Sequence, residues 1–260
     1  MCRLAAYLGT EIALERFLLK PEHSLVVQSW APKELRYAKL NADGFGFAWY
    51  GPDDRPATYV SAMPIWSDVN LEPLGRTLTS DLWVASVRSA TSGFASGPAN
   101  TQPFCDDDFI FAHNGYIGHF AERVRQAMCE LINPAVLATI KGNTDSEYIF
   151  ALIRHLLIED EELALESAIG EAFSLLEDWA DGEEALLNIV MSDGERIYAS
   201  RHAFNHDSPS LYYTTDDESF ADDAQLVASE ALTETGLWQP VPDHHILILD
   251  PEEPPELLAL

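Results

Sequence analysis

The segment MCRLAAYL (residues 1–8) places an apolar, strand-like run, Leu4–Leu8, directly behind a cysteine at the second position. Removal of the initiator Met would leave Cys2 with both a thiol and a free α-amine. An unperturbed α-amine has a pKa of about 7.7–8.0, so it can serve as the general base for its own thiol. An N-terminal nucleophile of this kind requires no histidine. The alternative is that Cys2 is simply the second residue of a strand.

The rest of the chain has strand signals at both ends and helical signals in the middle. Apolar or alternating runs bounded by Gly, Asp or Pro predict further strands at Gly46–Tyr50, Leu82–Val87, Phe109–His113, Ala185–Met191, Ile197–Arg201, Leu211–Thr215, Leu226–Ser229 and His245–Asp250. Helical periodicity predicts helices at Ile12–Leu19, Phe120–Ile132, Asp145–Leu157 and Glu161–Trp179. This segregation favours an α+β fold in which antiparallel sheets carry helices on their outer faces.

Composition and charge exclude several classes of protein. The 260 residues are 47% hydrophobic, which is typical of a globular chain, and they carry 15 Lys and Arg against 43 Asp and Glu. A net charge of -28 disfavours nucleic acid and anionic membranes as partners, because binding to phosphates depends on cationic side chains. No run approaches 18 apolar residues, and the apolar patch before Gly9 is too short for a signal-peptide core, so we predict a cytoplasmic protein.

The cysteines and histidines do not predict a metal site. Cys2, Cys105 and Cys129 show no CxxC spacing, which argues against a zinc knuckle or a disulfide framework. His244 and His245 adjoin each other without a third ligand at a useful spacing, and His202 and His206 lie in a segment that reads as a loop. We therefore expect no metal and no cofactor.

Polar residues at the ends of predicted elements suggest a site. Asn114 and Gly115 follow a strand, and an amide side chain beside a flexible backbone N–H suits an oxyanion hole, although an Asn-Gly turn has the same sequence. Arg88 ends another strand, where its guanidinium could grip a carboxylate or form a surface ion pair. Asp145 lies in a segment typical of a helix cap, and its carboxylate is also suited to an ammonium group.

In sequence order, these segments resemble the class II glutamine amidotransferases, which are Ntn hydrolases with a four-layer αββα sandwich of two antiparallel sheets. The matching segments are Cys2 behind Met1, Asn41–Gly46, Arg88–Thr91, Asn100–Phe104, His113–Gly115, Asn143–Glu147 and Ala228–Glu230. The resemblance implies one domain over residues 1–260, in which the acidic, Pro-rich segment 251–260 is a surface-packed or frayed tail.

Within that family the chain is most similar to the branch that contains the γ-glutamyl hydrolase of ergothioneine biosynthesis. The segments MCR (1–3), VQSWAP (27–32), NADGFG (41–46) and VRSAT (87–91) carry this likeness. Ser89 stands where synthase-linked relatives tend to have an aromatic residue, and no residues remain for a synthase domain. Two alternatives stay open: a glutaminase subunit that supplies ammonia to a separate synthase, and an inactive binding domain that retains the fold.

The resemblance also implies roles for individual residues. Cys2 would be the nucleophile, and Asn114 with the Gly115 N–H would stabilise the oxyanion. Substrate binding is implied for Arg88, which would hold the α-carboxylate of a γ-glutamyl amide, for Asp145, which would hold its α-ammonium group, and for Thr91 and His113. The expected partner is this small molecule, and the ammonia-donor alternative adds a separate synthase subunit. The sequence does not predict an oligomeric state.

Overall fold

The computed structural model describes residues 2–34, 40–89, 97–215 and 217–260, which form two antiparallel sheets. The first sheet has the strand order β12-β10-β11-β1-β4-β2-β3. Its strands are β1 (Arg3–Ala13), β2 (Phe45–Tyr50), β3 (Pro56–Ser61), β4 (Thr79–Val87), β10 (Tyr212–Thr214), β11 (Gln225–Ala228) and β12 (Gln239–Pro240).

The second sheet has the order β14-β13-β8-β7-β6-β5, and β9 pairs with β7 beside this path. Its strands are β5 (Phe104–Cys105), β6 (Ile110–Ile117), β7 (Ala185–Ser192), β8 (Ile197–Arg201), β9 (Ala203–Phe204), β13 (His245–Leu249) and β14 (Glu256–Ala259). Two short 3-10 helices, η1 (Ile65–Ser67) and η2 (Pro98–Asn100), lie in the connections.

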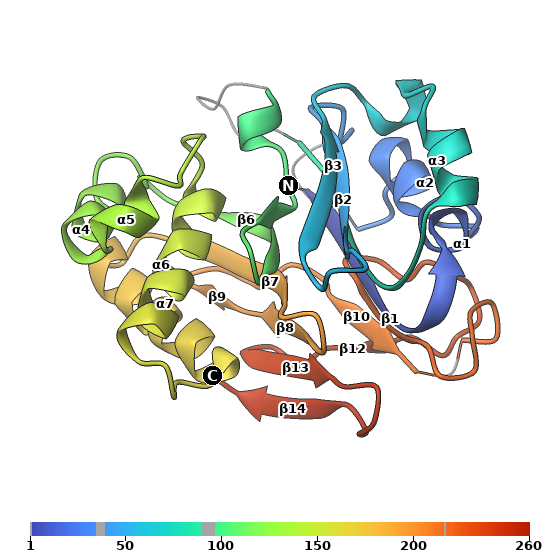
Figure 1. The fold of residues 1–260 in the computed structure, drawn as a ribbon. Coiled ribbons are helices and arrows are strands. Elements are labelled where there is room, and N and C mark those ends of the chain that lie inside the picture. The colour runs from blue at the N-terminus through green and yellow to red at the C-terminus, as the bar shows by residue number, and fades with distance from the viewer. Residues whose placement is uncertain (1, 35–39, 90–96, 216) are drawn as a thin grey trace.

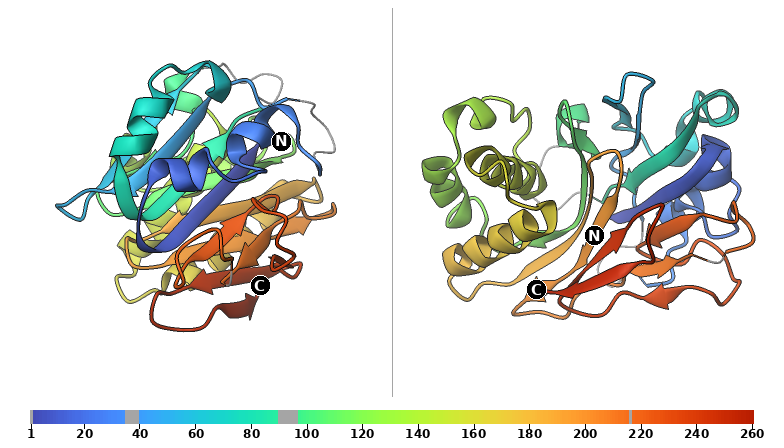
Figure 2. Two further views of the ribbon diagram at one scale, coloured as in Figure 1. Left: turned by 90° about the vertical axis from the view of Figure 1, so that its right-hand side faces the viewer. Right: turned by 60° about the horizontal axis from the view of Figure 1, so that its bottom comes forward.

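The helices form the two outer layers of the molecule. α1 (Leu14–Leu18), α2 (Leu25–Trp30) and α3 (Leu71–Thr77) cover the first sheet, whereas α4 (Val124–Leu131), α5 (Pro134–Leu137), α6 (Asp145–Glu159) and α7 (Leu165–Ala180) cover the second. Figure 1 shows the sheets between these two groups of helices, and Figure 2 shows the same layers from two other directions. The fold is therefore the predicted four-layer αββα sandwich.

The alternation of side chains along β1 explains how one strand serves two cores. Leu4, Ala6 and Leu8 belong to the apolar core between the sheets, whereas Ala5 and Tyr7 belong to the core beneath α1–α3. Successive side chains of a strand point to opposite faces, so a strand that is buried on both faces reads as a continuous apolar run. Cys2 lies just before the strand and two positions from Leu4, so it belongs to the same alternating series, which faces the space between the sheets.

The same rule divides β6, which lies in the second sheet. Ile110 and Ala112 belong to the core between the sheets, whereas Phe111 packs under the helices. Asn114 continues the series of Ala112 and therefore faces the first sheet. His113 continues the series of Phe111 and faces the helical layer.

Each predicted strand has a counterpart, but several boundaries and elements differ from the prediction. The helix predicted from Ile12 begins at Leu14, because Ile12 and Ala13 still pair with β4 after a register shift. The elements α2, α3, α5, β3, β5, β9 and β12 were not predicted. The tail, predicted to be surface-packed or frayed, contains β14. This strand pairs with residues His245–Ile248 of β13 and forms the edge of the sheet.

Within the described residues, none of the helices is both long enough and apolar enough to span a membrane.

Candidate active site

Cys2 lies at the start of the central strand of the first sheet, where it is half-buried. Its Sγ is 4.0 Å from the carbonyl oxygen of Ser89, the second residue after β4. Arg3 pairs in register with Val87, so the beginning of β1 lies beside the end of β4. This pairing brings Cys2 next to the Arg88–Ser89 segment, 86 or more residues away along the chain.

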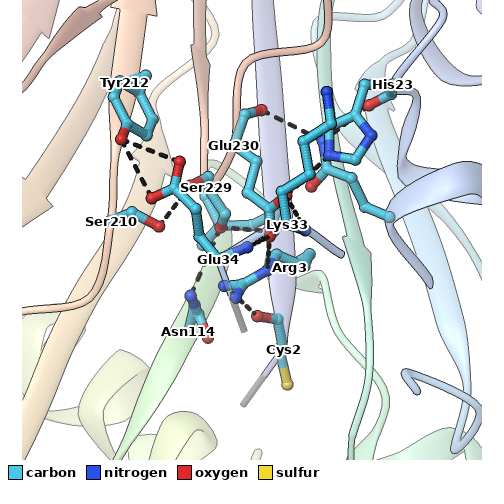
Figure 3. A network of polar contacts seen from close by, with 12 residues as sticks. Cys2, Arg3, His23, Lys33, Glu34, Asn114, Ser210, Tyr212, Ser229 and Glu230 are labelled. Carbon is cyan, nitrogen blue, oxygen red and sulfur yellow. Dashed lines mark hydrogen bonds and ion pairs between the residues drawn. The ribbon is translucent and has the colours of Figure 1, made fainter. Parts of the chain in front are cut away.

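Asn114 approaches the same region from the second sheet and is fully buried. The structure places its Nδ2 3.5 Å from the Oγ of Ser229, the residue after β11. Ser229 is bound to β1 in turn: its Oγ accepts a hydrogen bond from the N–H of Leu4 at 3.0 Å, and its own N–H donates to the Leu4 carbonyl at 2.9 Å. Ser229 thus links the candidate oxyanion residue to the strand that carries Cys2 (Figure 3).

A fully buried arginine adjoins the nucleophile. Nη1 of Arg3 donates to the carbonyl oxygen of Cys2 at 3.2 Å, and its Nε lies 2.9 Å from Oε1 of Glu230. Glu230 also contacts Nε2 of His23 at 2.7 Å and accepts the backbone N–H groups of Lys33 and Glu34. Figure 3 shows this network, in which the Arg3 guanidinium joins the Cys2 carbonyl to Glu230.

The network keeps Glu230 ionised. Burial raises the pKa of the Glu230 carboxyl, but the hydrogen bond with His23, the backbone donors and the charge of Arg3 outweigh burial and lower the pKa to about 2. Burial lowers the pKa of the Arg3 guanidinium, and the charge of Glu230 opposes this by raising it. The pair is thus a buried ion pair that anchors the first residues of β1.

His113 has its side chain on the face away from Cys2. Its Nε2 is 2.8 Å from the carbonyl oxygen of Leu186, so it carries the proton, and its Nδ1 is 2.9 Å from the hydroxyl of Ser146 in α6. Complete burial lowers the pKa of this imidazole, which favours the neutral form. Both ring nitrogens thus bind protein groups, and the substrate contact assigned to His113 from the sequence stays a prediction. The strand alternation that aims Asn114 at the other sheet turns His113 toward the helices.

Gly115 sits where no larger residue fits. A Cβ at this position would lie 1.7 Å from the carbonyl oxygen of Leu186 and 2.4 Å from Nε2 of His113. Any side chain would therefore break the hydrogen bond that holds His113. The glycine allows β6 to lie against Leu186 immediately after Asn114.

Arg88 directly follows β4 and is buried, and its backbone and side chain form hydrogen bonds with Asp43 and Gly44. Its backbone N–H donates to the Gly44 carbonyl at 2.8 Å, its carbonyl accepts from the Asp43 N–H, and its Nη1 donates to the Asp43 carbonyl at 3.3 Å. Gly44 has a φ of +123°, a conformation that favours glycine. The predicted carboxylate clamp thus lies one residue from Ser89, which contacts Cys2.

Asp145 is the first residue of α6 and is held by backbone donors. Its Oδ2 accepts the N–H of Ile117 at 2.9 Å, and its Oδ1 accepts the N–H of Ser146 at 2.7 Å. Thr144 caps the helix by accepting the Glu147 N–H at 3.3 Å. A carboxylate is favourable at a helix N-terminus, and the bond to Ile117 fixes it two residues beyond Gly115.

The structure thus gathers four of the predicted residues, Cys2, Asn114, Gly115 and Arg88, near the facing ends of β1, β4 and β6, and it places Asp145 at the adjoining end of β6. Thr91 lies outside the described residues. Sequence reasoning assigned no role to Arg3, Ser229 or Glu230. The signal that could have identified them is Arg3 itself, a charged residue at the start of an apolar strand, because a buried charge requires a partner.

The remaining cysteines and histidines do not form a competing site. Within the described ranges, no group of three or more His, Cys, Asp or Glu side chains is arranged to hold a metal ion. Burial, followed by the charge of Asp106, raises the pKa of the Cys105 thiol to about 12, so this thiol is unreactive at neutral pH. Nδ1 of His202 lies 3.0 Å from Nδ1 of His244, a pairing that the sequence did not predict.

A four-layer αββα sandwich with a cysteine at the start of its central strand is the architecture of the Ntn hydrolases. The sequence pattern of the family described as "Glutamine amidotransferases class-II" matches residues 22–252, so the chain belongs to that family.

Individual relatives agree with this assignment. The chain is 31% identical to the probable glutamine amidotransferase DUG3 of Saccharomyces cerevisiae, over 96% of this chain and 82% of that protein. It is 28% identical to the gamma-glutamyl-hercynylcysteine sulfoxide hydrolase of Mycolicibacterium smegmatis, over 95% of each.

Solved structures share the fold. A glutamine aminotransferase class-II domain protein from Silicibacter pomeroyi superposes with a TM-score of 0.72 at 26% identity and covers 99% of this chain and 98% of its own. The glutamine phosphoribosylpyrophosphate amidotransferase of B. subtilis superposes with a TM-score of 0.68 at 14% identity, over 99% of this chain and 49% of that one, and this shows the fold alone.

Proposed function

We propose that the chain is a one-domain γ-glutamyl amide hydrolase of the ergothioneine-pathway type, with Cys2 as an N-terminal nucleophile. The observation that carries the proposal is the link from Asn114 through Ser229 to Leu4, because it sets an amide side chain opposite the strand that directly follows Cys2. Two further supports are the full-length similarity to the mycobacterial hydrolase and the opening Cys2–Arg3 with its buried partner Glu230.

In the proposed reaction, the α-amine of Cys2 takes the thiol proton while Sγ attacks the γ-carbonyl carbon of the substrate. Asn114 and the Gly115 N–H stabilise the resulting oxyanion, a contribution of about 2.7–4 kcal/mol per donor. The α-ammonium group protonates the departing amine as the C–N bond breaks. Water then hydrolyses the γ-glutamyl thioester to glutamate and regenerates the thiol. Arg88 and Asp145 hold the carboxylate and ammonium groups of the glutamyl end.

The oxyanion role requires Asn114 to present Nδ2 to the substrate. In the structure Nδ2 points to Ser229, whereas the buried Oδ1 has no partner among the described residues. Rotation of the carboxamide by 180° places Oδ1 opposite the Ser229 hydroxyl, whose proton it can accept while Ser229 Oγ keeps the Leu4 N–H. The exchange satisfies Oδ1 and frees Nδ2 for the oxyanion. Ser229 is therefore proposed as the residue that positions the amide.

The test compares two substrates on enzyme from which intact-mass spectrometry shows Met1 to be absent. We expect a γ-glutamyl-cysteinyl thioether or sulfoxide to exceed glutamine in kcat/KM by at least about 100-fold, because binding of the larger amine helps to orient the reacting carbonyl. Equal or faster turnover of glutamine would instead identify an ammonia-donor subunit. Full activity in protein that retains Met1 would exclude an N-terminal nucleophile.

A further inference from the structure

The hydrogen bonds that hold β1 against β11 end before they reach the nucleophile. Among the described residues, the last backbone bond on this side runs from the Ser229 N–H to the Leu4 carbonyl at 2.9 Å. The antiparallel register of the two strands places Arg3 opposite Glu230 as the next pair, and Cys2 lies one residue further. The backbone of Cys2 is therefore outside this ladder and depends on another group to fix it.

The side chain of Arg3 supplies the missing contact. Its Nη1 donates to the Cys2 carbonyl at 3.2 Å, and no other described residue forms a hydrogen bond with the backbone of Cys2. This bond fixes the plane of the peptide between Cys2 and Arg3, and with it the position of the Cys2 Cα. Once Met1 is removed, the same Cα carries both the thiol and the α-amine. The placement of the nucleophile and of its base therefore depends on Arg3.

Arg3 can hold the carbonyl in one direction because its own guanidinium is held. Its Nε lies 2.9 Å from Oε1 of Glu230, and both side chains are at most 2% exposed. Glu230 in turn contacts Nε2 of His23 at 2.7 Å and accepts the backbone N–H groups of Lys33 and Glu34. A continuous set of contacts therefore runs from the segment around α2, through the ion pair, to the nucleophile (Figure 3).

An ion pair is not needed at this position if its role is only to anchor β1. Buried ion pairs are often replaced by apolar residues of similar size without loss of stability, although the loss of one partner alone is costly. An apolar pair would fill the same space beneath the strand, but it has no donor for the Cys2 carbonyl. The feature that distinguishes Arg3 from an apolar residue is thus its hydrogen bond to the nucleophile.

We propose that Arg3 is a positioning residue for the reaction of Cys2: its guanidinium, oriented by Glu230, holds the Cys2 peptide so that the thiol and the α-amine face the substrate together. The inference rests on the proposed function and adds the residue on which the placement of the nucleophile depends. Arg88 and Asp145 hold the glutamyl end in the proposed reaction, so Arg3 acts on kcat and not on KM. A displacement of about 1 Å costs about 100-fold in rate.

The experiment removes the donor without leaving a buried charge. In the double variant Arg3→Met/Glu230→Gln both charges are absent, Met fills the space of the arginine stem, and the Gln amide oxygen still accepts a backbone N–H. On enzyme from which Met1 is absent, we expect kcat for γ-glutamyl-S-methylcysteine to fall by about 100-fold, while KM changes by less than about 2-fold. Arg3→Lys keeps a single donor and should recover part of kcat.

The matched control is Arg154→Met/Asp106→Asn. Nε of Arg154 pairs with Asp106 at a distance from Cys2, and Asp106 also accepts backbone N–H groups, as Glu230 does. This variant should keep kcat within about 2-fold of the wild type. Calorimetric binding of glutamate, the product, should be equal in the wild type and both double variants, because the glutamyl clamps are intact.

Three results would overturn the proposal. One is an unchanged kcat in the Arg3→Met/Glu230→Gln variant at a temperature where its melting curve shows it to be folded. The second is a loss that is expressed in KM and in glutamate binding rather than in kcat. The third is an equal fall of kcat in the control variant.

The failure of the proposed function has a different signature. If the wild type hydrolyses no γ-glutamyl amide, that function is wrong, and NMR of protein carrying ¹³C at the cysteine Cβ then tests the positioning by itself. The Cys2 signal, assigned by its loss in Cys2→Ala, should be a single resonance in the wild type and should broaden or split in Arg3→Met/Glu230→Gln, whereas the Cys105 signal should stay single. A Cys2 resonance that remains single and equally sharp in the double variant would reject the role of Arg3.

Discussion

Oε1 of Glu230 lies 2.9 Å from Nε of Arg3, and both side chains are almost completely buried. The pair joins the residue next to the nucleophile with the segment that follows β11. We expect Glu230→Gln to lower the free energy of unfolding by about 3–5 kcal/mol, because it leaves the Arg3 charge buried without a partner.

The matched control for this change is Glu234→Gln, which removes the acid of an exposed ion pair with Lys33. Exposed ion pairs contribute about 0–1 kcal/mol, so urea denaturation should place this variant close to the wild type. Equal stability of Glu230→Gln and Glu234→Gln would show that the buried pair does not anchor β1.

Ser229→Ala tests the proposed orientation of the Asn114 amide. Without the hydroxyl, the carboxamide has no partner that selects one orientation, and we expect kcat to fall by about 10-fold, part of the factor of 10²–10³ that loss of an oxyanion donor costs. KM should change little. Ser192→Ala removes another buried hydroxyl, one that donates to the Arg196 carbonyl at the far end of β7, and it should leave kcat unchanged. A rise in KM without a fall in kcat would contradict the role of Ser229.

Gly115→Ala should abolish activity and destabilise the fold by about 3 kcal/mol, because the new methyl group collides with the Leu186 carbonyl and displaces His113. The opposite result is expected for Gly170→Ala within α7, where a Cβ meets only Leu260 at 3.7 Å. That change should stabilise the protein by about 0.5–1 kcal/mol. Thermal unfolding and turnover measure both variants, and an active Gly115→Ala enzyme would refute the steric argument.

The glutamine analogue 6-diazo-5-oxo-norleucine should alkylate Cys2. Cys105 has a thiol pKa of about 12, so at pH 8 only about one such thiol in 10,000 is ionised. Peptide mapping should find the label on Cys2 in the wild type and in Cys105→Ser, whereas Cys2→Ala should be inactive and unlabelled. Label on Cys105 or Cys129 would reject Cys2 as the nucleophile.

Acid should weaken the fold through His202. Burial, followed by the nearby His244, lowers the pKa of this imidazole to about 4, against about 6.5 in an unfolded chain. Between these values the unfolded chain binds a proton that the folded protein does not, so the free energy of unfolding decreases as pH falls from 6.5 toward 4.

The corresponding measurement is urea denaturation at pH 7.5, 6.0 and 5.0. His202→Gln should reduce the loss of stability across this range, since one proton-binding difference is removed. His245→Gln, whose parent imidazole contacts the Asp243 carbonyl, should behave as the wild type. An unchanged pH dependence in His202→Gln would contradict the assignment.

The sequence by itself was sufficient to predict the family and the layered architecture. Long apolar runs such as Leu4–Leu8 and Ala185–Met191 predict strands buried on both faces, and the order of the polar motifs behind Cys2 indicates the fold. These features are local, because strand periodicity and turn residues are properties of neighbouring positions. The same locality explains why the sequence did not predict a strand in the tail: nothing near Glu256–Ala259 reveals that β13 presents an open edge.

Only the tertiary structure decided which polar residues meet. Asn114 and His113 are neighbours in the sequence, yet one faces Ser229 between the sheets and the other faces Ser146 beneath the helices. Arg3 and Glu230 are separated by more than 200 residues and form a single buried pair. The physical reason is that burial and charge pairing depend on the packing of distant strands, which the local pattern does not contain.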